Sequence, residues 1–181
     1  MSLVEQAQAL QAEAQELYKL LDLGTAFLWE PVLIGSALSG LMVDRDLDVM
    51  FDAPDATTAA VLNGLVTLDR RVGLRSVDFR DERGDRRPTP AITDERFYAV
   101  LHTDTWKIDL TFWLHVVERP HVGDALRLTR VTDVQRRRIL ELKDGDGERD
   151  SSAIYAPYWG NRRVPAVRQR HRTVGTRLEE S

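Results

Sequence analysis

Two segments with strand periodicity, each carrying carboxylates on one side, constrain this chain more than any other feature. In Asp46–Phe51 the acidic Asp46 and Asp48 alternate with apolar residues, and in Trp106–His115 Asp109 does the same. Successive side chains of a strand point to opposite faces of a sheet. The chain is therefore expected to build a sheet that has one face on a hydrophobic core and one polar face.

Further segments have the composition of strands: Pro31–Ile34, residues 74–80 and Phe97–His102. The first is a continuous apolar run that stops at Gly35, which predicts a strand covered on both faces. Thr103–Thr105 is short enough to join the last of these strands to Trp106–His115 as a hairpin. The run Arg80–Arg87 is highly charged and precedes two prolines, which predicts an exposed, mobile loop.

Helical spacing of leucines predicts three helices: residues 3–22, 56–68 and 132–143. Gly24 is expected to end the first helix, and Asp55 and Gly73 to cap the two ends of the second. Thr132–Gln135 has the form of a capping box at the start of the third. Strands and helices together predict an α/β (α+β) fold, with a mixed, mainly antiparallel sheet, helices on one side and a cleft above the carboxylates.

At 181 residues the chain has the length of one domain, which we expect to span residues 1–150. Asp144–Ser152 is polar and rich in Gly, as linkers are. Residues 151–181 are expected to form a basic C-terminal tail, docked through Tyr155, Tyr158 and Trp159.

Composition excludes several classes of protein. The chain has no Cys, so a disulfide scaffold, a thiolate zinc site and a cysteine nucleophile are all excluded. It has no apolar run near the ~20 residues of a membrane span and no signal peptide, so a cytoplasmic protein is expected. The net charge of −4 gives no broad positive field for nucleic acid.

The acidic segments also suggest a chemistry. Two Asp residues at positions i and i+2 of a strand lie about 7 Å apart on one face, where they can converge on hard divalent cations. Asp109 on a neighbouring strand would complete the site, and two Mg²⁺ ions held there could clamp a phosphoryl displacement. Gly35 and Ser36 directly follow a strand, and a glycine there lets backbone amides approach a phosphate.

These residues resemble the nucleotidyltransferase superfamily related to DNA polymerase beta. The resemblance rests on Gly35–Gly40, which reads Gly-Ser-x-x-x-Gly, on Asp46-Leu47-Asp48, and on Asp109 about sixty residues later. It implies a polymerase beta-like fold and Mg²⁺-dependent transfer of a nucleoside monophosphate from a nucleoside triphosphate, with ATP the expected nucleotide. Asp46 and Asp48 would then bind both Mg²⁺ ions, and Asp109 the second.

Within that resemblance, Gly35 and Ser36 would hold the β- and γ-phosphates, and Lys143 would contact the nucleotide. Many members of the superfamily have Ser at the position of Arg45. An Arg at this position resembles some small bacterial antibiotic nucleotidyltransferases, including lincosamide-modifying ones. Arg45 could bind a triphosphate or pair with Asp44, and the sequence leaves both readings open.

The acceptor is predicted from charge and length alone. An acidic, short chain favours a small-molecule, antibiotic-like acceptor hydroxyl over nucleic acid. The alternatives are a toxin-type enzyme that modifies tRNA or protein, with residues 161–181 contacting RNA, and an inactive antitoxin-like module. Lys107 and His115 share the face of Asp109, where Lys107 could meet phosphate or solvent and His115 could meet the acceptor.

Overall fold

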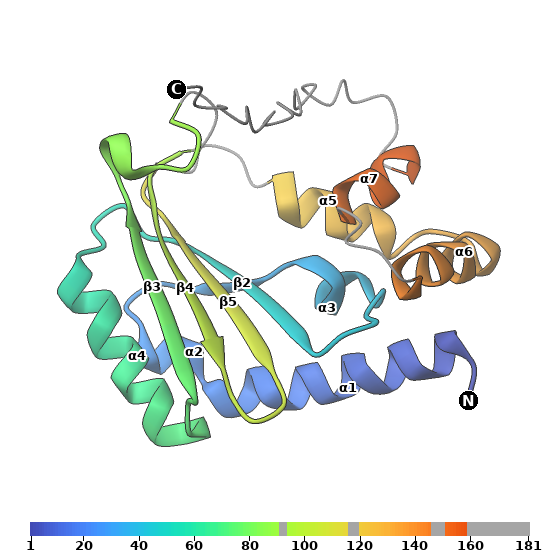
Figure 1. The fold of residues 1–181 in the computed structure, drawn as a ribbon, viewed down its shortest axis with the longest axis horizontal. Coiled ribbons are helices and arrows are strands. Elements are labelled where there is room, and N and C mark those ends of the chain that lie inside the picture. The colour runs from blue at the N-terminus through green and yellow to red at the C-terminus, as the bar shows by residue number, and fades with distance from the viewer. Residues whose placement is uncertain (91–93, 116–119, 146–150, 159–181) are drawn as a thin grey trace, which may run out of the picture.

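Five strands form one mixed sheet in the computed structural model, which describes residues 1–90, 94–115, 120–145 and 151–158 (Figure 1). The strands are β1 (Pro31–Leu33), β2 (Asp46–Asp52), β3 (Ser76–Glu82), β4 (Arg96–His102) and β5 (Lys107–Trp113), in the spatial order β1-β2-β5-β4-β3. Only the β2–β5 pair is parallel. The predicted mixed, mainly antiparallel sheet is therefore confirmed.

Helices α1, α2 and α4 pack on one face of this sheet, and α3 and α5–α7 group beyond β2 (Figure 1). The helices are α1 (Leu3–Leu21), α2 (Leu23–Ala26), α3 (Gly35–Ser39), α4 (Thr58–Val72), α5 (Pro120–Leu128), α6 (Asp133–Asp144) and α7 (Ser151–Tyr155), with 3-10 turns at η1 (Gly84–Arg86) and η2 (Ala156–Tyr158). The short helices α2, α3, α5 and α7 were not among the three predicted from leucine spacing.

The main core lies between the sheet and helices α1, α2 and α4. The inward residues of β2 and β5 include Phe51 and Phe112, whose rings stack with centroids 4.5 Å apart and meet Phe27 edge-on. Burying each such ring contributes roughly 1.5–3 kcal/mol. Because this burial fixes which side of each strand faces the helices, it also fixes the carboxylates on the opposite face.

A second, smaller core joins the amino-terminal half of α1 to α6 and α7. Ala7, Leu140 and Tyr155 are buried in it. The Arg136 side chain also donates to the backbone oxygens of Ser39 and Gly40, which ties α6 to the end of α3. Since Ala14 and Leu21 belong to the main core, α1 contributes to both cores.

The edge position of β1 corrects one prediction. Residues 31–34 do form a strand, but it pairs only with β2 and all three of its residues are partly exposed. The strand has three residues and forms the edge of the sheet, so it is not covered on both faces. A continuous apolar run cannot distinguish a buried central strand from a short edge strand.

Two predicted helix boundaries are also wrong. Helix α1 ends at Leu21 and is capped by Asp22, which adopts the left-handed conformation with φ 44°, so that Gly24 lies inside α2. Thr57 rather than Asp55 caps α4, because the Asp55 carboxylate instead accepts a hydrogen bond from the Trp29 indole at 2.7 Å. The predicted C-cap of α4 at Gly73 and the capping box at Thr132 are confirmed.

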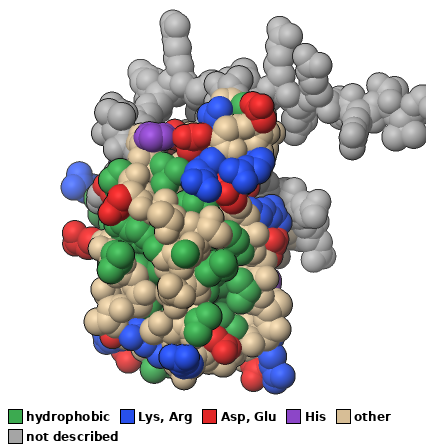
Figure 2. All heavy atoms as spheres, turned by 90° about the vertical axis from the view of Figure 1, so that its left-hand side faces the viewer, with side chains coloured by type: hydrophobic (Ala, Val, Ile, Leu, Met, Phe, Trp, Pro, Cys, Tyr) green, Lys and Arg blue, Asp and Glu red, His purple; other side chains and the backbone are tan. Residues whose placement is uncertain are grey.

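The β4–β5 hairpin is confirmed, with His102 paired to Lys107 across the turn. The charged run 80–87 is more ordered than predicted, because β3 extends to Glu82 and η1 follows. Its charges pair with one another, since Arg83 and Arg86 both contact Asp81. Figure 2 shows these blue and red side chains gathered at the top of the face formed by α4 and β3.

The predicted basic tail falls mostly outside the described residues, as do Trp159 and residues 146–150 of the predicted linker. Ile154 and Tyr155 of α7 are buried in the second core. The tail itself stays a prediction. In the described ranges, no helix combines the length and apolar character that crossing a membrane requires.

Candidate active site

Three carboxylates meet on the polar face of the sheet. The parallel register of β2 and β5 places Asp48 directly opposite Asp109, and Asp46 lies one two-residue step earlier on β2. One carboxylate oxygen of each residue lies within 4.8 Å of one from each of the others. A register shift of one residue would turn Asp109 into the core, so strand pairing is what assembles the cluster.

Crowding of negative charge in a partly buried place changes the ionisation of the cluster. Burial, reinforced by the charges of Asp46 and Asp109, raises the pKa of Asp48 to about 7. Burial also raises the pKa of Asp46. Asp48 is therefore only partly ionised at neutral pH, and a bound cation would compete with its proton.

Lys107 partly compensates this charge. Its Nζ lies 3.1 Å from Asp46 Oδ2 and 2.9 Å from Asp109 Oδ2. Burial alone would lower the pKa of Lys107, but the hydrogen bond to Asp109 and the charge of Asp46 outweigh it and raise that pKa. Lys107, which the sequence placed on this face, is thus an ammonium that links two of the three carboxylates.

Asp109 has one oxygen that is satisfied and one that is not. Its Oδ2 accepts hydrogen bonds from Lys107 and from the Tyr98 hydroxyl at 2.8 Å. Its Oδ1 is buried and has no hydrogen-bond partner among the described residues. A buried carboxylate oxygen without a partner, beside two further carboxylates, fits a hard cation such as Mg²⁺, which binds oxygen ligands.

The turn at Gly35 lets the backbone approach this cluster. Gly35 has φ 65°, and a Cβ built there would overlap the Asp48 carboxylate, with Asp48 Cγ only 3.1 Å away. The amide of Ile34 donates to the Asp48 carbonyl at 3.0 Å, which holds the turn against β2. Glycine is therefore required here both for its backbone conformation and for space.

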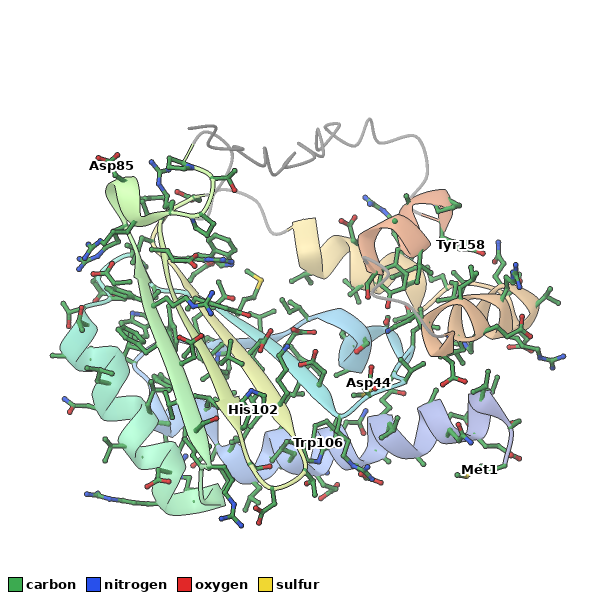
Figure 3. All side chains as sticks on the ribbon, in the orientation of Figure 1. Met1, Asp44, Asp85, His102, Trp106 and Tyr158 are labelled. Atoms are coloured by element: carbon green, nitrogen blue, oxygen red, sulfur yellow. The ribbon has the colours of Figure 1, made fainter. Side chains whose placement is uncertain are left out.

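A hollow of about 170 Å³ opens beside the turn. Its walls include Gly35, Ser36, Asp46, Asp48 and Lys143, so the structure brings together all the predicted nucleotide residues and two of the predicted metal ligands. Asp44 also lines it, and Figure 3 shows that residue in the loop before β2, on the side of the sheet where α6 lies.

Lys143 is fixed by two acceptors at this hollow. Its Nζ lies 2.7 Å from the Leu41 carbonyl oxygen and 2.9 Å from the Tyr155 hydroxyl. Burial lowers the pKa of Lys143, while the charges of Asp44 and Asp48 oppose that change. This amine therefore lies in a desolvated place where an added anion would stabilise its charge.

A second hollow, of about 260 Å³, lies on the other side of Asp48, over β5 and β4. Asp109, Thr111 and Trp113 of β5 and Arg96 and Tyr98 of β4 line it. The sequence alone did not identify Arg96 or Tyr98. Alternation along residues 96–102 could have placed both on the polar face, but only the pairing of β4 with β5 shows that this part of the face adjoins Asp109.

Two residues considered from the sequence lie outside both hollows. Arg45 pairs with Glu13 of α1 at 2.9 Å, rather than with Asp44. His115 lies two residues beyond the end of β5, where its Nε2 is 3.0 Å from Glu95 Oε2. Neither side chain lines the space around the carboxylates.

Comparison with known proteins identifies the fold. No model of a protein family matches the chain, and no curated protein sequence matches it. Among solved structures, it is similar to the Cid1 poly(U) polymerase in crystals with Mg and 3′-dATP bound, with a TM-score of 0.51 and 17% identity.

That match covers 73% of this chain and 41% of the Cid1 chain. A second Cid1 structure, described for its RNA terminal uridylyl transferase activity, has a TM-score of 0.46 and 20% identity over 73% of this chain and 39% of that one. The chain thus spans well under half the length of these proteins. The five-stranded mixed sheet and the first of these matches show that the chain has the polymerase beta-like nucleotidyltransferase fold.

Proposed function

We propose that this protein is a Mg²⁺-dependent nucleotidyltransferase that moves a nucleoside monophosphate from a nucleoside triphosphate to an acceptor hydroxyl. The observation that carries the proposal is the convergence of Asp46, Asp48 and Asp109 beside the Gly35 turn. A fold can host many activities, so the proposal rests on this site more than on the likeness to Cid1.

The residues have separate roles in the proposed reaction. Asp46 and Asp48 would hold two Mg²⁺ ions, with Asp109 as a further ligand of the second. Bound Mg²⁺ would neutralise charge on the phosphates and on the leaving pyrophosphate. Gly35 and Ser36 would hold the β- and γ-phosphates of ATP or another triphosphate, and the buried amine of Lys143 would face them across the first hollow.

The chemical step is a displacement at phosphorus. The acceptor hydroxyl oxygen forms a bond to the α-phosphorus, while the bond from that phosphorus to the bridging oxygen of the β-phosphate breaks. The electron pair of the broken bond leaves with pyrophosphate. Asp109 would help to deprotonate the acceptor, its carboxylate taking up the hydroxyl proton as the new bond forms.

A small-molecule acceptor is the part of the proposal that depends on shape and charge. The second hollow, at about 260 Å³, falls just below the ~300–1,000 Å³ usual for small-molecule pockets. The net charge of −4 gives no general attraction for a polymer of phosphates. An antibiotic-like acceptor belongs to this size class, as do many other hydroxyl compounds.

Transfer of label from α-³²P-ATP and α-³²P-GTP tests the proposal. We expect Mg²⁺-dependent release of pyrophosphate and labelling of a small hydroxyl compound, with a loss of at least about 100-fold in Asp46→Asn and Asp109→Asn. Asp104→Asn is the matched control, because Asp104 is 70% exposed and lies outside the site. Absence of nucleotide binding, or full activity in both site variants, would contradict the proposal, and labelling of RNA alone would contradict the small-molecule acceptor.

A further inference from the structure

Arg96 is held in the second hollow by one ion pair and two aromatic rings. Its Nε donates to Glu82 Oε2 at 2.6 Å, and the side chains of Arg96 and Glu82 are only 21% and 5% exposed. The guanidinium also lies over the rings of Tyr98 and Trp113, at 4.8 and 5.2 Å from their centroids. A buried ion pair flanked by two aromatic rings keeps the guanidinium plane in one orientation.

This arrangement leaves hydrogen-bond donors unused. A guanidinium has five N–H groups, and among the described residues only Glu82 accepts from Arg96, through Nε. Arg96 lines the same hollow as Asp109 and Thr111. The terminal N–H groups of Arg96 are therefore suited to an acceptor group of a ligand in that hollow, and a guanidinium fork matches a carboxylate or phosphate best.

The sheet sets the length of a ligand that could use both ends of the hollow. Arg96 pairs with Trp113, Tyr98 with Thr111, and Asp109 lies two residues before Thr111 on β5. Side chains on one strand face repeat about every 7 Å, so Arg96 lies about 13 Å along the strands from Asp109. A molecule of one or two rings would span this distance.

We propose that the second hollow binds the acceptor and that Arg96 determines its chemical class. The acceptor would present its hydroxyl at Asp109, lay a ring against Trp113, and place an anionic oxygen group, carboxylate or phosphate, on Arg96. This inference rests on the proposed nucleotidyl transfer and narrows its acceptor from hydroxyl compounds in general to anionic ones. A polycationic hydroxyl compound would place positive charge against the guanidinium and would be repelled by it.

The test uses one two-ring acceptor in three forms that differ only in the anionic group: phenyl β-glucoside, and the same glucoside with a carboxylate or a phosphate group at the para position of the phenyl ring, which can reach from Asp109 toward Arg96. Each is supplied with α-³²P-ATP and Mg²⁺, and kcat/KM is measured. We expect the parent protein to prefer the phosphate or carboxylate member by about 10- to 100-fold, as the loss of a charged hydrogen bond would predict. Whichever of the two anionic members is preferred identifies the group that Arg96 binds.

The variants must leave no buried charge without a partner. Glu82→Gln/Arg96→Met removes the ion pair as a unit, since loss of Arg96 alone would leave Glu82 buried and unpaired. Arg75→Gln is the control, because Arg75 is 71% exposed, pairs with the exposed Asp104 and does not line the hollow. The double variant should abolish the preference and leave Mg²⁺-ATP affinity within twofold of the parent, whereas the control should keep the preference.

The outcomes separate this inference from the function on which it rests. If the parent binds and consumes ATP but uses neutral and anionic members equally, or if the double variant keeps the preference, the role of Arg96 is wrong and nucleotidyl transfer stands. If the parent binds no Mg²⁺-ATP by calorimetry, nucleotidyl transfer is wrong, and this inference falls with it.

Discussion

Asp48 is the residue whose ionisation ties the stability of the protein to its proposed chemistry. Its pKa is about 7 in the folded protein, against the usual 3.8 of an Asp. Between these values the folded state holds a proton that the unfolded state has lost, so the free energy of unfolding falls as pH rises through this range. Above pH 7 both states are ionised and this contribution stays constant.

We therefore predict that the Mg²⁺-free protein has a higher Tm at pH 5.5 than at pH 8, by roughly 5 °C. Mg²⁺ should remove this difference, because a cation stabilises the ionised carboxylates of the folded state. Thermal unfolding at pH 5.5 and at pH 8, in EDTA and in Mg²⁺, measures the Tm difference without and with the metal. The Asp48→Asn variant should show a smaller dependence on pH than the parent, and an equal dependence would contradict the pKa of Asp48.

Lys107 lies where its charge competes with a bound metal. Its ammonium contacts Asp46 and Asp109 at 3.1 and 2.9 Å. Removing it in Lys107→Met should lower the Tm of the metal-free protein, because the two carboxylates then repel each other without compensation. The same change should tighten Mg²⁺ binding about 10-fold, measured by calorimetry.

The exposed Lys19, which pairs with Glu16 on the surface, provides the control substitution Lys19→Met. Weaker Mg²⁺ binding in Lys107→Met than in this control would mean that Lys107 supports the metal site rather than competing with it.

At the scale of elements, the turn from β1 into α3 requires glycine both for its backbone conformation and for space. Gly35 and Gly73 have nearly the same φ, 65° and 63°, but a Cβ at Gly35 meets Asp48 whereas a Cβ at Gly73 meets nothing within 4 Å. Alanine at either position should lower stability by about 1–2 kcal/mol for the left-handed backbone. Only Gly35→Ala should also displace Asp48.

We predict that Gly35→Ala loses Mg²⁺ and ATP binding by at least 10-fold, while Gly73→Ala binds both as the parent does. Calorimetry on the two folded variants makes the comparison between two glycines of nearly equal φ. Equal binding by both would mean that the close approach of Gly35 to Asp48 has no role in the site.

The longer helices and strands could be predicted from the sequence, and the shortest helices could not. Strands β2, β4 and β5 and helices α1, α4 and α6 were predicted because each is long enough to show its period. Helices α2 and α3 have four and five residues, barely more than one turn, so no period can appear. Asp55 failed as a cap because its partner, the Trp29 indole, comes from a distant part of the chain.

Some residues of the candidate site could be predicted from the sequence and others could not. Asp46 and Asp48 share a face through strand periodicity alone, so their proximity could be predicted from the sequence. Alternation placed Asp109 on the polar face of its strand, and the family resemblance supported its place beside Asp48, because nothing in the sequence specifies that β5 pairs with β2 in parallel. Arg96 and Glu82 were missed because their contact depends on the pairing of β3 with β4.

At the scale of the whole molecule, the first hollow lies between the two hydrophobic cores. Asp46 and Asp48 come from the sheet, whereas Lys143 and Tyr155 come from α6 and α7 of the second core. A nucleotide bound there would contact both parts. Its binding energy should then stabilise α6 and α7 against local opening.

We predict that Mg²⁺-ATP slows amide hydrogen exchange in α6 and α7 at least 10-fold, in addition to its effect on β2. Lys143→Met should reduce protection in α6 and α7 more than in β2, because it removes the contact from that side. Protection confined to the sheet in the parent protein would show that the nucleotide does not reach the second core.

The two hollows are lined mostly by different segments of the chain, so one of them could be altered without the other. The walls of the first hollow come from segments more than a hundred residues apart, whereas five of the residues that line the second hollow, Arg96, Tyr98, Asp109, Thr111 and Trp113, belong to one continuous hairpin and are joined there by Ile34, Asp48 and Val49. On the proposed assignment, most side chains that meet the acceptor thus belong to one stretch of the chain, although Arg96 also depends on Glu82 of β3. Grafting another hairpin of equal length onto this scaffold, with Asp109 retained, would redirect the enzyme toward new products without rebuilding its triphosphate chemistry.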